Sequence, residues 1–253
     1  MNQTVAMRDK KLCIFLTAGF PRLDSMPRLI GVLEEEGVDY VEIGMPYSDP
    51  LADGLTIQQT SKAALENGMK MDLLFAQLKE IRDQTHVPLI YMGYLNPVLK
   101  YGVEKFIDEA LGAGIVGCIL PDLPMELYAE TYRDLFNSHG LGMNFLVSPG
   151  TSEERIRMAD RLSDQYLYII SQNTITGTPK EAIQTEGDFY HRLNAMDLTS
   201  EKLIGFGISD RAGVERAYRY ADGAIIGSAF LKAIGGSTDP ENAARQFIRA
   251  VKP

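Results

Sequence analysis

Two carboxylates, Glu42 and Asp53, occupy positions from which acidic side chains could perform acid–base chemistry. Glu42 belongs to Tyr40–Gly44, a predicted buried strand whose period of two puts Val41 and Ile43 on the opposite face. No other charged residue of this segment shares the face of Glu42. Because burial disfavours a carboxylate, we expect the pKa of Glu42 to be raised towards neutrality, which suits a group that both donates and accepts a proton.

Asp53 belongs to the turn-rich loop that follows this strand. Thr56 and Gln59 have the spacing of a capping box, which predicts a helix beginning at Thr56 and leaves Asp53 free of a capping role. An Asp-Gly pair is also a common turn sequence, so a structural role for Asp53 stays open at this point. Asp122 lies between two prolines, and a rigid turn is its favoured interpretation.

The rest of the chain repeats one unit, a short apolar strand followed by a helical segment. Strands are predicted at residues 14–18, 40–44, 88–92, 117–122, 144–148, 166–171, 203–208 and 223–228. Helices are predicted at residues 24–36, 56–66, 72–84, 103–111, 126–138, 152–163, 180–194 and 210–220, with a last pair within 229–251. Strands that alternate with helices pair in parallel, so this pattern predicts an α/β fold, a closed (β/α)8 TIM barrel forming a single domain over residues 1–253.

The active site of such a barrel is built from the residues that follow each strand. These strand ends carry Thr17, Gly19, Glu42, Met92, Tyr94, Asn96, Asp122, Ser148, Ser171, Gly205, Phe206, Gly207, Gly227 and Ser228. None of the predicted strands contains Lys, Arg or His. A Schiff-base mechanism needs a lysine, and a metal site usually needs His or Cys beside carboxylates, so we expect no metal and favour carboxylate acid–base chemistry.

A phosphate site is predicted at the end of the chain. GFGISD at 205–210 and GSAFLKAI at 227–234 each join a strand to a helix, where main-chain N–H groups can bind an anion without basic side chains. Ordinary helix capping by Ser209, Asp210 and Ser228 is the structural alternative. Across the barrel mouth we expect a flat apolar pocket lined by Phe15, Ile57, Tyr94, Ile119, Tyr168 and Phe206.

Composition narrows the classes of partner. The 25 basic and 34 acidic residues give a net charge of −9, and no basic run exceeds Lys10-Lys11, which disfavours a nucleic-acid partner. The apolar run from Leu12 is too short and too interrupted for a signal peptide or a membrane span, so a cytoplasmic protein is predicted. Cys13 and Cys118 fall in apolar strand-forming segments and are expected to be buried and inert.

The segment YVEIGMPYSDPLADGLTIQ, residues 40–58, closely resembles the signature of the tryptophan synthase α subunit family. The resemblance extends over nearly the whole chain, through LTAGFP, MGYLNPVLKYG, LPDLP, TITGT, GFGIS and GSA. It implies cleavage of indole-3-glycerol phosphate to indole and glyceraldehyde 3-phosphate, a retro-aldol reaction. It also implies a β subunit partner that receives the indole and carries pyridoxal phosphate, in an α2β2 tetramer, with no cofactor in this chain.

The resemblance assigns roles by motif position. Glu42 is the general acid–base at the indole C3 and the glycerol hydroxyl, and Asp53 holds the indole N–H. Thr176 would hydrogen-bond Asp53 when the loop after strand six closes. The residues expected to hold phosphate are Gly177, Gly207, Gly227 and Ser228. In the family the loop at residues 49–51 reaches the β subunit.

The sequence departs from the family pattern in two places, and three other functions are compared with the resemblance. About eleven residues precede Leu12, where members usually have a helix that plugs the barrel, and Gln172 replaces a common arginine. Indole-glycerol-phosphate synthase would need a lysine on a barrel strand, and a phosphoribosyl isomerase would need aspartates after strands one and five; the predicted strands supply neither. A weakly active subunit that mainly activates a β partner stays open.

Overall fold

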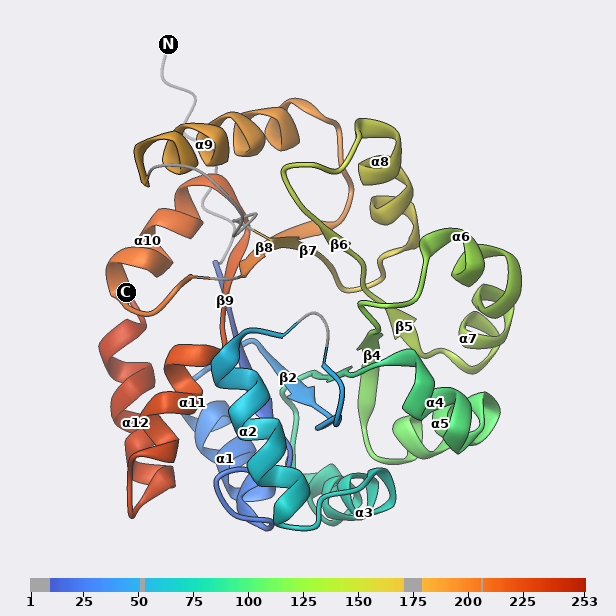
Figure 1. Cartoon of the computed structure of the whole chain (residues 1–253), viewed down its shortest axis with the longest axis vertical. Helices are drawn as coiled ribbons and strands as arrows, with labels where there is room; N and C mark the ends of the chain where they lie inside the picture. Colours follow the sequence, from blue (N-terminus) through green and yellow to red (C-terminus); the bar gives the residue numbers. More distant parts are fainter. Residues whose placement is uncertain (1–9, 51–52, 171–178, 206) are drawn as a thin grey trace.

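Parallel strands form a ring at the centre of the molecule, and helices surround it (Figure 1). The computed structural model describes residues 10–50, 53–170, 179–205 and 207–253, and of residues 179–186 it describes the backbone alone. The strands of these residues are β1 (Lys11–Thr17), β2 (Tyr40–Gly44), β3 (Leu89–Met92), β4 (Ile115–Ile119), β5 (Gly142–Met143), β6 (Leu146–Val147), β7 (Tyr166–Ile170), β8 (Glu201–Gly205) and β9 (Gly223–Ile226). Their order is β5-β4-β3-β2-β1-β9-β8-β7-β6, and all paired neighbours are parallel.

The fifth predicted strand is split into β5 and β6, and this split closes the ring. Met143 is the last residue that pairs with β4, and Leu146 is the first that pairs with β7. Between them, Asn144 N–H donates to Cys118 O at 2.8 Å, and Phe145 O accepts from Tyr168 N–H at 3.0 Å, so one strand bonds to both neighbours. The (β/α)8 barrel prediction is therefore confirmed.

The side chain of Asn144 explains why the strand can bend. Its Oδ1 accepts the main-chain N–H groups of Gln165 and Tyr166, both at 3.0 Å, at the start of β7. A buried N–H without an acceptor is costly, so this amide takes the place of the carbonyl that a straight strand would supply. The single strand predicted for residues 144–148 is therefore wrong in its bounds, while the other strands lie within three residues of their predictions.

Alternation along the strands separates two apolar layers. Val41 and Ile43 of β2 face the helices within the larger core, as predicted. The inward-facing residues form a second cluster inside the barrel, made of Cys13, Ile90, Ile119, Tyr166, Tyr168, Leu203 and Ile225. Cys13 and Cys118 are buried and free, as expected. Glu42 therefore lies among aromatic and aliphatic groups and not among ions.

Helices follow the strands around the ring. They are α1 (Ser25–Glu35), α2 (Leu55–Glu66), α3 (Met71–Ile81), η1 (Arg82–Gln84), α4 (Leu95–Tyr101), α5 (Val103–Gly112), α6 (Met125–Leu127), η2 (Tyr128–Tyr132), α7 (Arg133–His139), α8 (Glu153–Leu162), α9 (Pro179–Ala195), α10 (Arg211–Tyr220), α11 (Ser228–Gly235) and α12 (Pro240–Val251). The predicted capping box is wrong, because α2 begins at Leu55 with Gly54 as its N-cap and no side-chain capping bond. Helix α4 was not predicted; its proline, Pro97, lies in the first turn, where proline is tolerated.

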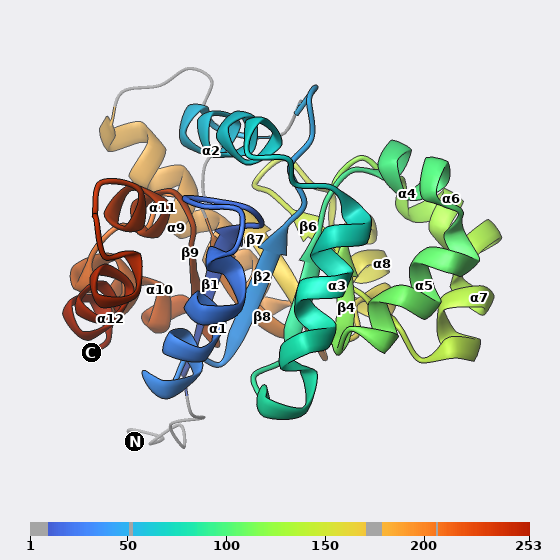
Figure 2. The same cartoon turned by 90° about the horizontal axis from the view of Figure 1, so that it is seen from below.

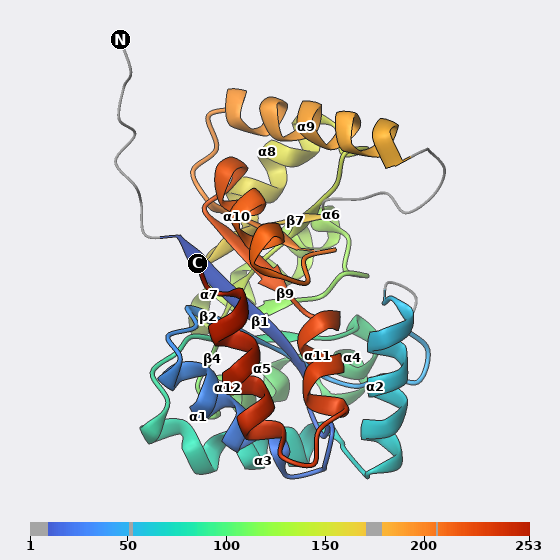
Figure 3. The same ribbon diagram turned by 90° about the vertical axis from the view of Figure 1, so that its left-hand side faces the viewer.

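The first and last helices complete the outer layer. Figure 3 shows α12 beside α1, and Glu36, which follows α1, accepts hydrogen bonds from Arg245 and Arg249 of α12. Figure 2 shows α2 at the end of the barrel where β2 finishes, and α2 also packs against α11. Among the helices of the described residues, none is both long enough and apolar enough to cross a membrane.

Candidate active site

A cavity of about 340 Å³ opens at the end of the barrel where the strands finish. Its walls contain both predicted carboxylates, Glu42 and Asp53. Other parts of the wall come from residues that follow the strands, including Pro121 after β4 and Gly227 after β9. The complete lining consists of Phe15, Glu42, Asp53, Gly54, Ile57, Met92, Pro121, Leu146, Tyr168, Ile170, Gly207, Ile208, Ser209, Ile225, Gly227, Ser228, Ala229 and Lys232. The cavity wall is therefore largely apolar, and it contains two carboxylates and two glycine-rich segments.

Glu42 points into the barrel from the middle of β2, between Phe15 of β1 and Ile90 of β3. The residue is 1% exposed. Removal from water raises its pKa to about 7, because the charged form loses hydration inside the apolar barrel. The expected shift of the Glu42 pKa towards neutrality is confirmed.

Glu42 has a neutral partner that the sequence analysis did not identify. The hydroxyl of Tyr166 donates to Glu42 Oε1 at 2.6 Å. This bond and a weaker one from the thiol of Cys13 favour the carboxylate and oppose the effect of burial on the pKa. The second oxygen, Oε2, has no hydrogen-bond partner among the described residues. One oxygen of Glu42 is thus fixed, while the other is available to a ligand in the cavity.

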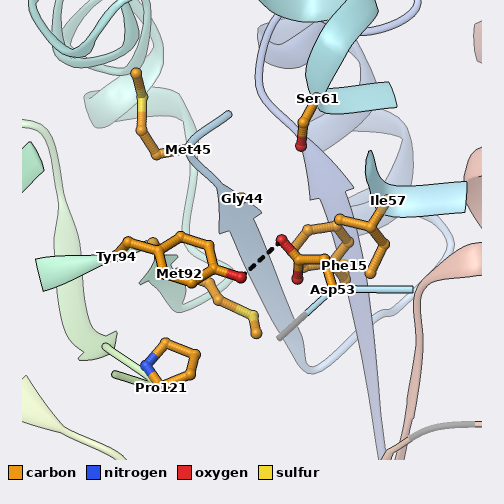
Figure 4. Close-up of a pocket in the computed structure, with 10 residues that line it drawn as sticks. Phe15, Gly44, Met45, Asp53, Ile57, Ser61, Met92, Tyr94 and Pro121 are labelled. Atoms are coloured by element: carbon orange, nitrogen blue, oxygen red, sulfur yellow. Dashed lines mark hydrogen bonds between the residues drawn. The ribbon is translucent and has the colours of Figure 1, made fainter. Parts of the chain in front are cut away.

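Asp53 lines the same cavity from the end of the loop that precedes α2. Its Oδ2 accepts a hydrogen bond from the hydroxyl of Tyr94 at 3.2 Å, and Figure 4 shows the two side chains pointing towards each other. Partial burial raises the pKa of Asp53, and the bond from Tyr94 acts in the opposite direction. Because Gly54 is the N-cap and uses no side-chain bond, Asp53 does not cap the helix, as predicted.

Asp122 stabilises the backbone next to Tyr94. Its Oδ1 accepts the main-chain N–H of Leu95 at 2.8 Å, at the start of α4, next to Tyr94. It does not line the cavity. Asp122 is therefore a structural residue that fixes the backbone beside Tyr94, in agreement with its structural interpretation.

Two glycines make room for the aromatic wall. A side chain at Gly44 would overlap the ring of Phe15, and a side chain at Gly205 would overlap the hydroxyl end of Tyr168. Both aromatic side chains line the cavity. Their positions therefore depend on glycines in the adjacent strands.

The two glycine-rich segments differ in how their helices begin. Asp210 caps α10, because its Oδ1 accepts from Gly213 N–H at 2.8 Å. Helix α11 begins at Ser228 after Gly227, and no side chain caps it. The first N–H groups of α11 therefore remain available to an anion in the cavity. Gly207, at φ +73°, lines the same cavity, and among the described residues other than its chain neighbours no atom lies within 4 Å of where its Cβ would be.

Some of the predicted pocket residues line the cavity, and others do not. Phe15, Ile57 and Tyr168 line the cavity, and Tyr94 lines a small adjoining hollow with Asp53. Ile119 does not line either one and belongs to the barrel interior. The predicted residues Thr176, Gly177 and Phe206, and also Ser171 and Gln172, lie outside the described residues, as does any N-terminal plug within residues 1–9.

Sequence reasoning missed several lining residues and one basic group. Tyr166 shares the strand face of Tyr168, so the period of two could have identified it. The expectation of a phosphate end without basic side chains overlooked Lys232, which lies within GSAFLKAI and lines the cavity. Met92, Leu146, Ile170 and Ile225 follow the same inward alternation and were not assigned to the pocket.

The expectation that no strand contains lysine is wrong. Observed strands start earlier than predicted, so β1 includes Lys11 and β8 includes Lys202. Both lie at the opposite end of the barrel from the cavity, 3.4 Å from Asp39 and 3.5 Å from Asp222 respectively. Neither lines the cavity. Carboxylates therefore remain the groups in this cavity suited to acid–base chemistry.

Comparison with known proteins identifies the family of this chain. The sequence model for the tryptophan synthase alpha chain matches residues 1–252. The tryptophan synthase alpha chain of Flavobacterium psychrophilum is 47% identical over 232 residues, 92% of each chain. That of Christiangramia forsetii is 43% identical over 252 residues, 100% of this chain and 98% of the relative. A chain of the solved tryptophan synthase α2β2 complex from Pyrococcus furiosus superposes with a TM-score of 0.88 at 31% identity, over 97% of this chain and 98% of that one. This chain belongs to the tryptophan synthase alpha chain family.

Proposed function

We propose that Glu42 and Asp53 perform the reaction of this family, the cleavage of indole-3-glycerol phosphate to indole and glyceraldehyde 3-phosphate. The chain is a carbon–carbon lyase of tryptophan biosynthesis. One observation carries the residue assignment: a buried carboxyl group with one unbonded oxygen lines the same cavity as a second carboxylate and an uncapped helix start. These three features match the three parts of the substrate that change or carry charge.

Glu42 first donates its proton to C3 of the indole ring. The carboxylate that remains then accepts the proton of the hydroxyl on the adjoining glycerol carbon. As that hydroxyl becomes the aldehyde, the electron pair of the breaking carbon–carbon bond returns to the ring and indole leaves. A pKa of about 7 fits both steps, since each protonation state of Glu42 is accessible near neutral pH.

Asp53 stabilises the ring while it is charged. Protonation at C3 places positive charge on the indole nitrogen, and a fixed carboxylate facing the N–H lowers the energy of that state. The bond from Tyr94 keeps Asp53 oriented before substrate binds, so little reorganisation is needed. The apolar wall formed by Phe15, Ile57 and Tyr168 excludes water from the ring.

The phosphate group is assigned to the glycine-rich segments of the cavity wall. Gly207, Gly227 and Ser228 lie there, and the open N–H groups of α11 can hydrogen-bond phosphate oxygens. By family position, Gly177 would add a further main-chain contact and Thr176 would reach Asp53. This placement fixes the substrate with its reacting carbon between the carboxylates and the glycerol chain along the cavity.

The partner is the tryptophan synthase β subunit, in an assembly like the α2β2 complex of Pyrococcus furiosus. A second groove of about 450 Å³ lies beside the loop after β2, and its wall includes Pro50 and Leu55, which is 77% exposed. Exposed apolar surface of this kind marks interaction sites, so we assign the groove to the β subunit. We expect pyridoxal phosphate in that subunit and no cofactor in this chain. A phosphorylated substrate does not cross membranes unaided, from which we infer a cytoplasmic location.

An indole-release assay tests the function. The purified chain is incubated with indole-3-glycerol phosphate, alone and with a tryptophan synthase β subunit, and indole is quantified. We expect release in both cases, faster with the β subunit. Absence of indole in both mixtures would refute the proposal. Release that requires the β subunit to be present would identify this chain as a subunit that mainly activates its partner.

A further inference from the structure

Lys232 lies on the wall of the catalytic cavity at its glycine-rich end. Its helix, α11, contributes Ser228, Ala229 and Lys232 to that wall, which is the pattern of one helical face. Ser228 and Lys232 are four residues apart, so their side chains are neighbours along this face. Side chains on a helix lean towards its N-terminus, which carries the ammonium group of Lys232 back towards the uncapped first turn.

The charges around the cavity give Lys232 a distinct position. Of the described residues that line the cavity, it alone is basic, whereas Glu42 and Asp53 are acidic. Within the described part of the chain, its side chain forms no ion pair or side-chain hydrogen bond. A phosphate dianion that enters this cavity therefore meets two acidic residues, of which Asp53 is the carboxylate when Glu42 is protonated, and Lys232 supplies the opposing charge.

We propose that Lys232 is a further specificity-determining residue of this active site, which attracts the phosphate group of the substrate and favours its dianionic form. The proposal rests on the function assigned above. Main-chain N–H groups fix the position of the phosphate, and the lysine adds a full charge that acts over a longer distance. Because the phosphate is remote from the bond that breaks, Lys232 affects substrate binding equally before and during the reaction, which changes KM and leaves kcat unchanged.

Kinetics of cleavage and of the reverse condensation distinguish an effect of Lys232 on phosphate binding from an effect on binding of the indole ring. The wild type, Lys232→Gln and Lys232→Arg are compared in cleavage and in the reverse condensation of indole with glyceraldehyde 3-phosphate. Lys100→Gln is the matched control, since Lys100 is exposed and does not line the cavity. Lys232 is itself exposed at the rim, so we expect a moderate effect: Lys232→Gln raises the KM for both phosphorylated substrates about three- to fivefold. The KM for indole and kcat stay unchanged, and Lys232→Arg restores the wild-type KM.

Salt gives an independent readout. Added salt is expected to raise the wild-type KM for glyceraldehyde 3-phosphate. The dependence of this KM on salt concentration is expected to be weaker in Lys232→Gln, because screening acts on the charge pair that the variant lacks. Equal KM values and equal salt slopes in Lys232→Gln and Lys100→Gln would overturn the proposal. So would a rise in the KM for indole that matches the rise for the phosphorylated substrate, since that indicates a general distortion.

A purely structural role of Lys232 at the end of α11 predicts a different result. Lys232 lies in the last turn of α11, where a positive charge also stabilises the helix end. A lower melting temperature of Lys232→Gln with unchanged KM would assign the residue to that role and overturn the proposal. If the wild type cleaves no substrate, the proposed function fails, and calorimetric affinities of both proteins for glyceraldehyde 3-phosphate still decide the role of Lys232.

Discussion

The hydroxyl group of Tyr166 lies 2.6 Å from Oε1 of Glu42, and both residues are almost completely buried inside the barrel. The bond fixes one oxygen of the carboxyl group and leaves Oε2 without a partner among the described residues. It also stabilises the ionised form against the effect of burial. The orientation and the proton affinity of Glu42 are therefore set by the same contact.

Tyr166→Phe is expected to raise the pKa of Glu42 above its value of about 7, because it removes a donor that favours the carboxylate. Glu42 starts the proposed cycle protonated, so kcat/KM falls as pH rises through this pKa, and in the variant the fall moves to higher pH. The measurement is the pH dependence of indole release. Tyr91→Phe is the control, since Tyr91 is also buried but its hydroxyl has no hydrogen-bond partner among the described residues. Identical midpoints in wild type and Tyr166→Phe would contradict the assignment.

Tyr94→Phe is expected to lower kcat about tenfold, since a hydrogen bond to a charged group contributes about 1.5 kcal/mol and here it orients Asp53. Steady-state indole release gives kcat and KM. Tyr101→Phe makes the same chemical change where the hydroxyl donates to Asp72 at 2.7 Å, on an exposed part of the molecule. A kcat for Tyr94→Phe equal to that of Tyr101→Phe would show that the contact with Asp53 has no catalytic role.

Gly207→Val is expected to raise the substrate dissociation constant roughly tenfold, about 1.4 kcal/mol. The new side chain would project from the cavity wall into the open space at the proposed phosphate end. Calorimetry with the substrate or with glyceraldehyde 3-phosphate measures the change. Gly140→Val carries a similar backbone strain, with φ +82° against +73°, at the C-cap of α7, and Gly140 does not line the cavity. An unchanged dissociation constant in Gly207→Val would place the phosphate elsewhere.

Pro50→Gly is expected to lose most of the activation by a β subunit while the isolated chain keeps nearly its full activity. Pro50 lines the groove assigned to the partner and lies three residues before Asp53, so its fixed φ limits the conformations of the connecting loop. Indole release is followed as the β subunit is titrated. Pro240→Gly, at the start of α12, should be activated like wild type. Equal activation of Pro50→Gly and wild type would show that this loop does not couple the two subunits.

Local rules predicted much of the fold. The period of two in β2 put Glu42 inside the barrel, and strand–helix alternation predicted the parallel ring. The same reasoning failed where distant contacts decide. The fifth strand divides because Asn144 bonds the backbone of residues 165 and 166, and no local pattern encodes that pairing. Helix α2 begins at Leu55 without the predicted capping box, because Gly54 ends the loop in an extended conformation.

The sequence predicted only part of the site, again because some of its contacts join residues that are distant in the chain. Glu42 and Asp53 could be selected as acidic residues after or within one strand, since both belong to a single short segment. Tyr166 lies 124 residues from Glu42 in the chain, and their contact depends on the closure of the whole barrel. Ile119 was placed in the pocket as one of the apolar residues expected at the barrel mouth, but it belongs to the cluster inside the barrel and lines neither cavity.

The central claim is that Glu42 transfers the proton that starts carbon–carbon cleavage. The direct test compares Glu42→Gln with wild type in two measurements, indole release and calorimetric affinity for indole-3-glycerol phosphate. The amide keeps the shape of the side chain but cannot transfer a proton. The variant is expected to bind the substrate with an affinity close to that of wild type and to release no indole. Indole release above about a tenth of the wild-type rate, less than ~1.4 kcal/mol of lost transition-state stabilisation, would contradict the claim.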